Sequence, residues 1–468
     1  MTSESAYWTI AEAAAQLRRG KLSPVELTQA ALLRIEKLNP RLNAFITITA
    51  ERALRDAKSA EREMQGGKYR GLLHGIPITL KDNIWTRGIG TTAGSKILKD
   101  FVPAVDAGVA KRLRNAGAVL LGKTNLHEFA YGITTENPHY GATRNPWNTE
   151  RIPGGSSGGS AAALATGIGF GSVGTDTGGS IRIPAALCGI VGLKPTFGRV
   201  SCDGIVPLAV TLDHAGPIAR SVVDVAIVLD TIAAKQEADG NFHRMLRAGG
   251  GMKKTCAKLR LGWPREYFFK RVEGEVKRAV EKAVGEFEKM GARMEEVSLP
   301  HIEDSIEPST QIALAEALEY HESQGYFPAR AADYGEDVRK RLQMGNAIRA
   351  VDYLKAQQAR KRVREDFRAA FERVDAIVAP TTPIAAPRLG QDSTTIGGES
   401  ESVRGALVRM NRPANFTGFP AISIPCGFTR NGLPIGMALH GPKWGEAKLL
   451  RIAFAYEQAT EWHLQHPE

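Results

Sequence analysis

A tract rich in glycine and serine constrains this chain more than any other feature. Residues 153–180 contain ten glycines and five serines in 28 positions. Such a composition is typical of a flexible linker. The tract nevertheless includes Ala161-Ala-Ala-Leu-Ala, a helix-forming run, and Ile181-Arg-Ile-Pro-Ala-Ala-Leu-Cys follows it directly. Because glycine lets the backbone approach a ligand closely, we favour a functional loop inside a folded domain over a linker.

The rest of the chain has the composition of a globular protein. Of its 468 residues, 43% are hydrophobic and 24% are charged, which excludes a disordered, collagen-like or disulfide-rich chain. Four cysteines lie far apart and lack metal-site spacing, so we expect a cytoplasmic protein without structural disulfides. The first residues lack the pattern of a signal peptide, and no run approaches the ~18 apolar residues of a membrane span. No membrane partner is therefore expected.

Hydrophobic periodicity predicts helices that alternate with strands. Capping boxes at Thr9 and Ser23 predict two helices, which end at Gly20 and near Leu38, before Asn39-Pro40. Asn431-Gly432 between two apolar runs predicts a β-hairpin. Further helices are expected over residues 50–64, 107–115, 221–233, 272–290 and 350–371, and strands over 74–81, 118–121 and 376–383. Apolar strands towards both ends, with a charged, helix-prone insert between them, predict one sheet built from distant segments.

Three motifs suggest chemistry that their surroundings contradict. Gly117–Thr124 matches the phosphate-binding pattern GxxxxGK[ST], but its intervening Ala-Val-Leu-Leu favours a buried strand. Gly154–Gly158 matches GxSxG, but the turn-forming residues 145–153 before it supply no strand for a hydrolase elbow. Of the ten histidines, only His463 and His466 have helical spacing, so no metal site is expected.

Several long segments together resemble the amidase signature family. Among them are PGGSSGGSAAA, GTDTGGSIR and GIPITLKDNI. They occur in one order and cover nearly the whole chain, at residues 75–84, 122–130, 153–163, 174–182, 188–196 and 418–425. The resemblance implies an α/β fold: a single α/β/α domain with a mixed, twisted β-sheet and helices on both faces. We expect an N-terminal helical layer (1–68), a signature core (69–235), a variable helical insert (236–376) and C-terminal strands and a helix that complete the sheet (377–468).

The resemblance also implies a catalytic Ser-cisSer-Lys triad. The lysine of its Lys-Asp-Asn motif falls on Lys81, and the bridging serine, which follows a cis peptide bond in the family, falls on Ser156. The nucleophile falls on Ser180, 24 residues later. Lys81 ends an apolar strand, where burial would lower its pKa and leave a neutral amine that can act as a base. Asp82 would raise that pKa, so its side chain is expected to point elsewhere and accept backbone hydrogen bonds.

The remaining site residues follow from the same segments. Thr177, Gly178, Gly179 and Ser180 offer consecutive N–H groups and are the expected oxyanion hole. Ser157, Asp176 and Arg182 are expected to support the site by hydrogen bonds, and Tyr131 and Thr134 to line the substrate pocket. Cys188 and Cys202 are interpreted as small buried residues rather than nucleophiles. No cofactor is expected.

We therefore expect an amidase that hydrolyses a small carboxylic amide through an acyl-enzyme on Ser180. The alternative within the family is the A subunit of a tRNA-dependent amidotransferase, which takes ammonia from glutamine and needs a partner. That protein typically has glutamine where this chain has Ile183, which favours the free-standing amidase. The oligomeric state, including a homodimer, stays open.

A nucleic-acid-binding protein is the remaining alternative. It would use the net charge of +11 and the arginines Arg360, Arg362, Arg364 and Arg368. Glu365 and Asp366 interrupt that cluster, so we do not expect nucleic acid as a partner.

Overall fold

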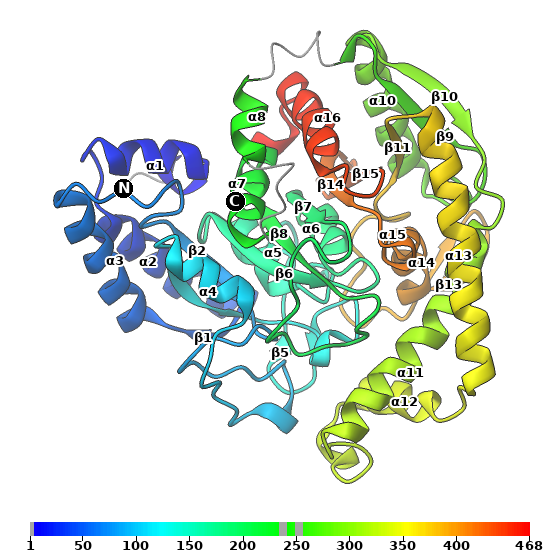
Figure 1. Ribbon diagram of the computed structural model, residues 1–468, viewed down its shortest axis with the longest axis horizontal. Coiled ribbons are helices and arrows are strands. Elements are labelled where there is room, and N and C mark those ends of the chain that lie inside the picture. The colour runs from blue at the N-terminus through cyan, green and yellow to red at the C-terminus, as the bar shows by residue number, and fades with distance from the viewer. Residues whose placement is uncertain (1–3, 234–240, 249–255) are drawn as a thin grey trace.

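The computed structural model describes residues 4–233, 241–248 and 256–468 (Figure 1). Its centre is a mixed sheet in which parallel and antiparallel pairs alternate in blocks. In spatial order its eleven strands are β1 (Phe45–Ile48), β3 (Val119–Thr124), β2 (Pro77–Lys81), β6 (Gly171–Asp176), β8 (His214–Ala219), β7 (Val191–Lys194), β14 (Ala421–Phe428), β15 (Pro434–His440), β11 (Ala376–Pro380), β9 (Arg260–Pro264) and β10 (Arg293–Val297). Strands from the two ends of the chain therefore share one sheet, as predicted.

Helices surround this sheet. Figure 1 shows the N-terminal helices together at one side and the long α13 along the other. The helices are α1 (Ile10–Arg18), α2 (Pro24–Leu42), α3 (Ala50–Gln65), α4 (Gly108–Asn115), α5 (Gly158–Ala165), α6 (Arg182–Cys188), α7 (Val222–Ile232), α8 (Phe242–Ala248), α10 (Gly274–Lys289), α11 (Glu307–Ser323), α12 (Glu336–Gly345), α13 (Ala350–Arg373), α14 (Val403–Arg409), α15 (Arg412–Thr417) and α16 (Glu446–Ala459). Two small sheets pair β4 (Glu136–Asn137) with β5 (Gly141–Ala142) and β12 (Ser393–Ile396) with β13 (Glu399–Ser402).

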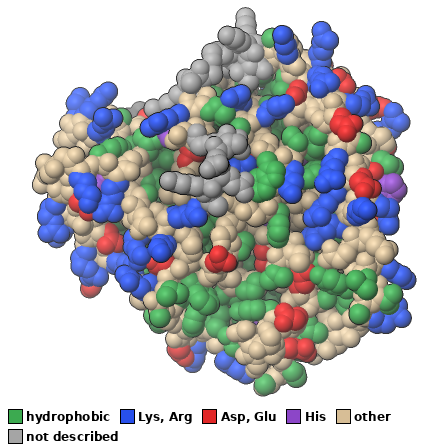
Figure 2. All heavy atoms as spheres, viewed as in Figure 1, with side chains coloured by type: hydrophobic (Ala, Val, Ile, Leu, Met, Phe, Trp, Pro, Cys, Tyr) green, Lys and Arg blue, Asp and Glu red, His purple; other side chains and the backbone are tan. Residues whose placement is uncertain are grey.

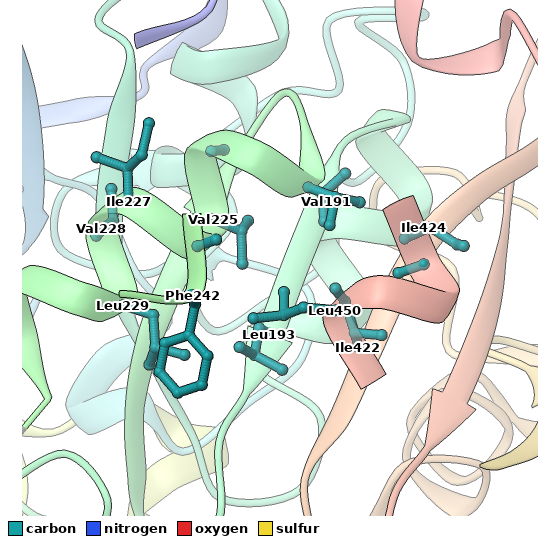
Figure 3. Packing of buried hydrophobic residues seen from close by; sticks show 14 of the residues in the cluster. Val191, Leu193, Val225, Ile227, Val228, Leu229, Phe242, Ile422, Ile424 and Leu450 are labelled. Carbon is teal, nitrogen blue, oxygen red and sulfur yellow. The ribbon is translucent and has the colours of Figure 1, made fainter. Parts of the chain in front are cut away.

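The central strands are covered on both faces. In β8, Ala215 and Ala219 belong to the same core cluster as the helix α7. Ile218, whose side chain points to the opposite face, packs instead with Leu164 of α5. Figure 3 shows β7 contributing Val191 and Leu193 to the α7 side, beside residues of β14 and α16. The expected arrangement of helices on both faces is confirmed.

Two expectations about single elements are wrong. Both predicted capping boxes are present, but α2 continues past Leu38 and Pro40 to Leu42. Proline removes only one hydrogen bond when it lies in the last turn, and Asn43, in the left-handed conformation (φ 50°), ends the helix instead.

The insert 236–376 is not wholly helical, because β9 and β10 extend the sheet. The charged residues of the edge strand β10 hid its β pattern in the sequence.

Two of the four arginines that suggested a basic surface on α13, Arg360 and Arg364, are bound to backbone carbonyl oxygens instead. Arg360 is buried and donates hydrogen bonds to the carbonyl oxygens of Phe416 and Thr211, at 2.6 Å each. Arg364 likewise donates to a carbonyl oxygen, at 2.9 Å. On the face drawn in Figure 2, blue Lys and Arg side chains lie scattered among red acidic ones. Among the helices in the described part of the chain, none has the length and apolar run that crossing a bilayer requires.

Candidate active site

The strand β2 brings Lys81 into the interior at its carboxyl end. Because β2 and β6 are parallel neighbours, the carboxyl end of β6 lies at the same edge of the sheet. The Lys81 Nζ atom donates to Ser156 Oγ and to Thr175 Oγ1 of β6, at 2.7 Å each. All three side chains are buried. The predicted pairing of Lys81 with Ser156 is therefore present, and Thr175 is a partner that the sequence analysis missed.

Burial changes the charge state of this lysine. Removal from water lowers the pKa of Lys81 from 10.5 to about 7, although the carboxylates of Asp176 and Asp213 oppose the shift. Asp213 is itself held by the hydroxyl of Thr177 at 2.5 Å. The amine of Lys81 is thus about half neutral near neutral pH.

Asp82, the next residue, is turned away from this amine. Its carboxylate accepts hydrogen bonds from the Thr92 N–H (2.9 Å) and the Thr92 hydroxyl (2.5 Å), and it lies 3.3 Å from Lys123 Nζ. Lys123 lies in β3, so the phosphate-loop-like segment is a buried strand, as predicted. The lysine of that motif neutralises Asp82 instead of binding a phosphate.

The loop before Ser156 is closely packed. The Gly155–Ser156 peptide bond is cis. The hydroxyl of Thr135 donates to the Gly154 carbonyl (2.8 Å) and accepts the N–H of Gly158 (3.1 Å). A Cβ atom on Gly158 would lie 2.4 Å from that hydroxyl, so glycine is required there. No strand precedes the GxSxG match within the described residues 145–153, which agrees with our rejection of a hydrolase elbow.

Ser180 lies at the end of the loop that follows β6. Its side chain lines a small cavity, and its carbonyl oxygen accepts the N–H of Ser157 at 3.2 Å. The hydrogen bonds of the described residues do not include one between Ser156 Oγ and Ser180 Oγ. Hydrogen bonds of a catalytic relay are often long or poorly aligned until substrate is bound. The fold thus brings the three predicted residues to one site and joins two of them directly.

The N–H groups of this loop are only partly as expected. Gly179 donates its N–H to the Asp176 carboxylate at 2.8 Å, so it is not available to a ligand. In the described structure, the N–H groups of Thr177, Gly178 and Ser180 have no protein acceptor. Gly179 has φ 119°, and a Cβ atom there would lie 2.6 Å from Asn411. The expected oxyanion hole therefore loses one of its four donors.

Asp176 is the centre of a buried ionic network. Arg182 donates two hydrogen bonds to its carboxylate, at 3.0 Å each, and a third to Asn415 at 2.7 Å. Asn415 donates in turn to the carboxylate and the carbonyl oxygen of Asp176. Burial alone would raise the pKa of Asp176, but Arg182, with help from Lys194 and the Asn415 hydrogen bond, brings that pKa below its usual range. Ser157, the third expected support, donates to the Thr175 carbonyl at 3.3 Å.

The cavity beside Ser180 is small, with a volume of about 30 Å³. Tyr131 lines it, as predicted, together with Arg404 and Arg412, which no sequence motif indicated. Thr134 is not among its lining residues; its hydroxyl lies 3.3 Å from His127 Nδ1 instead.

The other predicted groups lie away from this cavity. Ile183 is fully buried in an apolar cluster that includes Ile133 and Leu187. Cys188 is buried and Cys202 half-buried, and burial raises the pKa of both thiols, that of Cys202 to about 12. The described residues include no group of three or more His, Cys, Asp or Glu side chains that could hold a metal ion.

Comparison with known proteins places this chain in a family. The family model described as Amidase matches residues 26–450. Curated relatives include the A component of the glutamyl-tRNA(Gln) amidotransferase of Moorella thermoacetica, 41% identical over 99% of this chain and 98% of the relative. The corresponding protein of Chromohalobacter salexigens is 42% identical over 98% of both chains.

Solved structures share the fold. A chain from a vestigial protein complex, described as revealing the origins of an s-triazine catabolic enzyme, superposes with a TM-score of 0.89 at 35% identity, covering 96% of this chain and 98% of that one. The peptide amidase of Stenotrophomonas maltophilia has a TM-score of 0.84 at 34% identity, with 97% of each chain covered. The A component of the glutamyl-tRNA(Gln) amidotransferase of Thermotoga maritima has a TM-score of 0.78 at 35% identity, with 96% and 94% covered.

The ionic network makes a prediction about stability. Arg182→Met removes the cation and leaves the Asp176 carboxylate buried without its partner, which typically costs about 3–5 kcal/mol. We expect a clearly lower midpoint of urea denaturation for this variant. The double variant Arg182→Met, Asp176→Asn should recover part of the loss, because it removes both charges. Arg430→Gln, whose side chain is 90% exposed, is the control and should change little; equal midpoints for all three variants would contradict the network's role.

Proposed function

The chain belongs to the amidase signature family of enzymes that act on carbon–nitrogen bonds, and we propose that it hydrolyses a carboxamide through an acyl-enzyme on Ser180. The observation that carries this proposal is the buried contact between Lys81 Nζ and Ser156 Oγ, at 2.7 Å. It supports a relay in which an amine with a pKa of about 7 accepts the proton of Ser156. Serine–lysine arrangements of this kind replace the histidine base of other hydrolases.

The proposed reaction moves one proton through two hydroxyls. Ser180 Oγ attacks the amide carbon while its proton passes to Ser156 Oγ, whose own proton passes to the neutral amine of Lys81. The N–H groups of Thr177, Gly178 and Ser180 stabilise the oxyanion, each donor contributing about 3–4 kcal/mol to lowering the barrier. The relay then returns the proton to the leaving nitrogen, which departs as ammonia, and water hydrolyses the ester to the free acid.

We further propose that the chain is the ammonia-releasing A component of an amidotransferase and acts with a partner protein. Two curated relatives with that description are 41% and 42% identical over nearly full length. We therefore rank the amidotransferase component above the free-standing amidase. The sequence alone led us to expect the reverse, because Ile183 favoured the free-standing amidase. The side chain of Ile183 is buried outside the cavity, so its identity says little about the substrate that the cavity accepts.

A free-standing amidase is the second candidate. It is supported by the structural superpositions, because a chain described as an amidase reaches a TM-score of 0.88 and the peptide amidase 0.84, against 0.78 for the amidotransferase component. Both candidates use the same proton relay. They differ in whether a partner is needed.

The need for a partner can be measured directly. Ammonia release from a panel of primary amides, glutamine included, would be followed for the chain alone and after co-expression with the other components of an amidotransferase. We expect co-purification and at least a tenfold higher kcat/KM with the partners. Full activity of the isolated chain on simple amides, together with no co-purification, would favour the free-standing amidase.

The nucleophile is tested by a single substitution. Ser180→Ala should abolish ammonia release, because it removes the hydroxyl that attacks the amide carbon. Mass spectrometry of the intact protein during turnover should find an ester adduct on the native chain and none on the variant. Ser400→Ala, at an exposed position, is the matched control and should retain full activity. More than a trace of activity in Ser180→Ala would disprove the assignment.

The charge state of Lys81 predicts a pH profile. The neutral amine is the active form, so activity is lost as the pH falls through its pKa of about 7. We expect kcat/KM to rise about tenfold per pH unit below pH 7 and to level off above about pH 8. Lys81→Met should lower kcat/KM by at least about 100-fold, whereas the exposed Lys289→Met should not. A flat profile between pH 6 and 9 would point to a different base.

A further inference from the structure

We propose that Arg404 and Arg412 form a carboxylate-binding site in the cavity beside Ser180, so that the substrate is a short amide bearing a carboxylate. This inference rests on the proposed function for the identity of the scissile amide. It adds the residues of this chain that would hold the substrate carboxylate, which neither the proton relay nor family membership specifies.

Arg404 is a cation without a counter-charge. It lies on α14 and lines the cavity. Its guanidinium group makes no hydrogen bond or ion pair with any described residue, and the ring of Tyr131 lies 5.9 Å away. Burial, with Arg341 and Arg412 nearby, lowers the pKa of Arg404 to about 9. A guanidinium in this setting lacks the anion that would normally accompany it.

Arg412 is held in place but not neutralised. One end of its guanidinium group donates to the hydroxyls of Ser309 (2.8 Å) and Thr310 (2.5 Å) and to the Ile306 carbonyl (3.3 Å). All three acceptors are uncharged. These bonds fix the side chain at the wall of the cavity, and burial lowers its pKa as well.

A third arginine nearby, Arg341, differs from these two because a carboxylate neutralises it. The guanidinium group of Arg341 lies 5.3 Å from the centre of the Tyr131 ring and pairs with the carboxylate of Asp337. It also donates to the carbonyl oxygen of Tyr131. Asp337 is therefore already engaged. Arg404 and Arg412 have no such partner among the described residues.

The cavity also offers a hydroxyl and lacks an acid. The Tyr131 hydroxyl is buried without a hydrogen-bond partner in the described structure, so it is available to a bound carboxylate. None of the residues that line the cavity is Asp or Glu. A carboxylate would thus gain two cations and a hydroxyl, whereas an ammonium group, such as that of glutamine, would gain no counter-charge there.

The volume limits the distance between the two ends of the substrate. The cavity has a volume of only about 30 Å³, and Ser180, Arg404 and Arg412 all line it, so few atoms separate the nucleophile from the two cations. The carboxylate must then lie within a few bonds of the amide. Monoamides of short dicarboxylic acids have this form, and guanidinium groups bind such carboxylates in a bidentate manner.

Three matched probes test the proposal. Glutaramate carries an amide and a carboxylate, glutaramide is its neutral isostere, and glutamine adds an ammonium group to glutaramate. Binding would be measured by calorimetry on the full chain carrying Ser180→Ala, which prevents turnover. We expect glutaramate to bind at least tenfold more tightly than glutaramide, and glutamine no more tightly than glutaramate.

Substitution of Arg404 assigns the effect to the site. Arg404→Gln should lower glutaramate affinity at least tenfold and leave glutaramide affinity unchanged, and Arg404→Lys, which keeps the charge, should lose less. The exposed Arg430→Gln is the control. If Arg404→Gln does not fold, Arg404→Lys and the comparison of the two probes on the unsubstituted site still decide the question.

The outcomes separate this inference from the proposed function. Equal binding of glutaramate and glutaramide, or a loss in Arg404→Gln that is the same for both, would overturn the carboxylate site and leave amide hydrolysis intact. Charge-selective binding without hydrolysis by the chain that retains Ser180, both alone and with the other components of an amidotransferase, would overturn the proposed function and leave the carboxylate site standing.

Discussion

The burial of one amine between two hydroxyls is the constraint on which the site depends. Lys81 contacts Ser156 and Thr175 only because β2 and β6 are parallel and end at the same edge of the sheet. A lysine in that position would stay charged if a carboxylate faced it. The neighbouring Asp82 is prevented from doing so by Lys123, one strand away. The two buried lysines therefore differ in their partners: Lys123 is paired with a carboxylate, whereas Lys81 contacts two hydroxyls, and burial lowers the pKa of both amines.

The glycines of the 153–180 tract serve this arrangement through close packing. Gly158 makes room for the Thr135 hydroxyl, and Gly179 passes Asn411 so closely that a Cβ atom would not fit. The Asp176 carboxylate accepts the Gly179 N–H. The neighbouring N–H groups of the described loop, those of Gly178 and Ser180, do not donate to that carboxylate. Because Arg182 and Asn415 hold that carboxylate, the loop around Ser180 is fixed by groups that do not line the cavity themselves.

Several helices, one strand and the proposed relay residues could be predicted from the sequence, because each of these signals lies within one short segment. Capping boxes located α1 and α2, alternation located β2, and the motifs located Lys81, Ser156 and Ser180. Contacts between distant segments were not predictable in the same way. Asn415 meets Asp176 across 239 residues, and Arg404 reaches the cavity from a segment without a motif. The donor lost at Gly179 depends on the direction of one carboxylate, which spacing alone does not specify.

The reaction and the substrate are specified by different parts of the chain. The proton relay belongs to β2, β6 and the glycine–serine tract, which lie in segments that carry the family resemblance. The cations of the cavity come from α14 and α15, outside those segments. On α15, Arg412 and Asn415 are three residues apart and so lie on one side of the helix. Asn415 holds the loop that carries the nucleophile, and Arg412 faces the cavity. One short helix therefore sets the position of Arg412 relative to Ser180, so a change in this helix would alter the proposed substrate site without touching the residues of the relay.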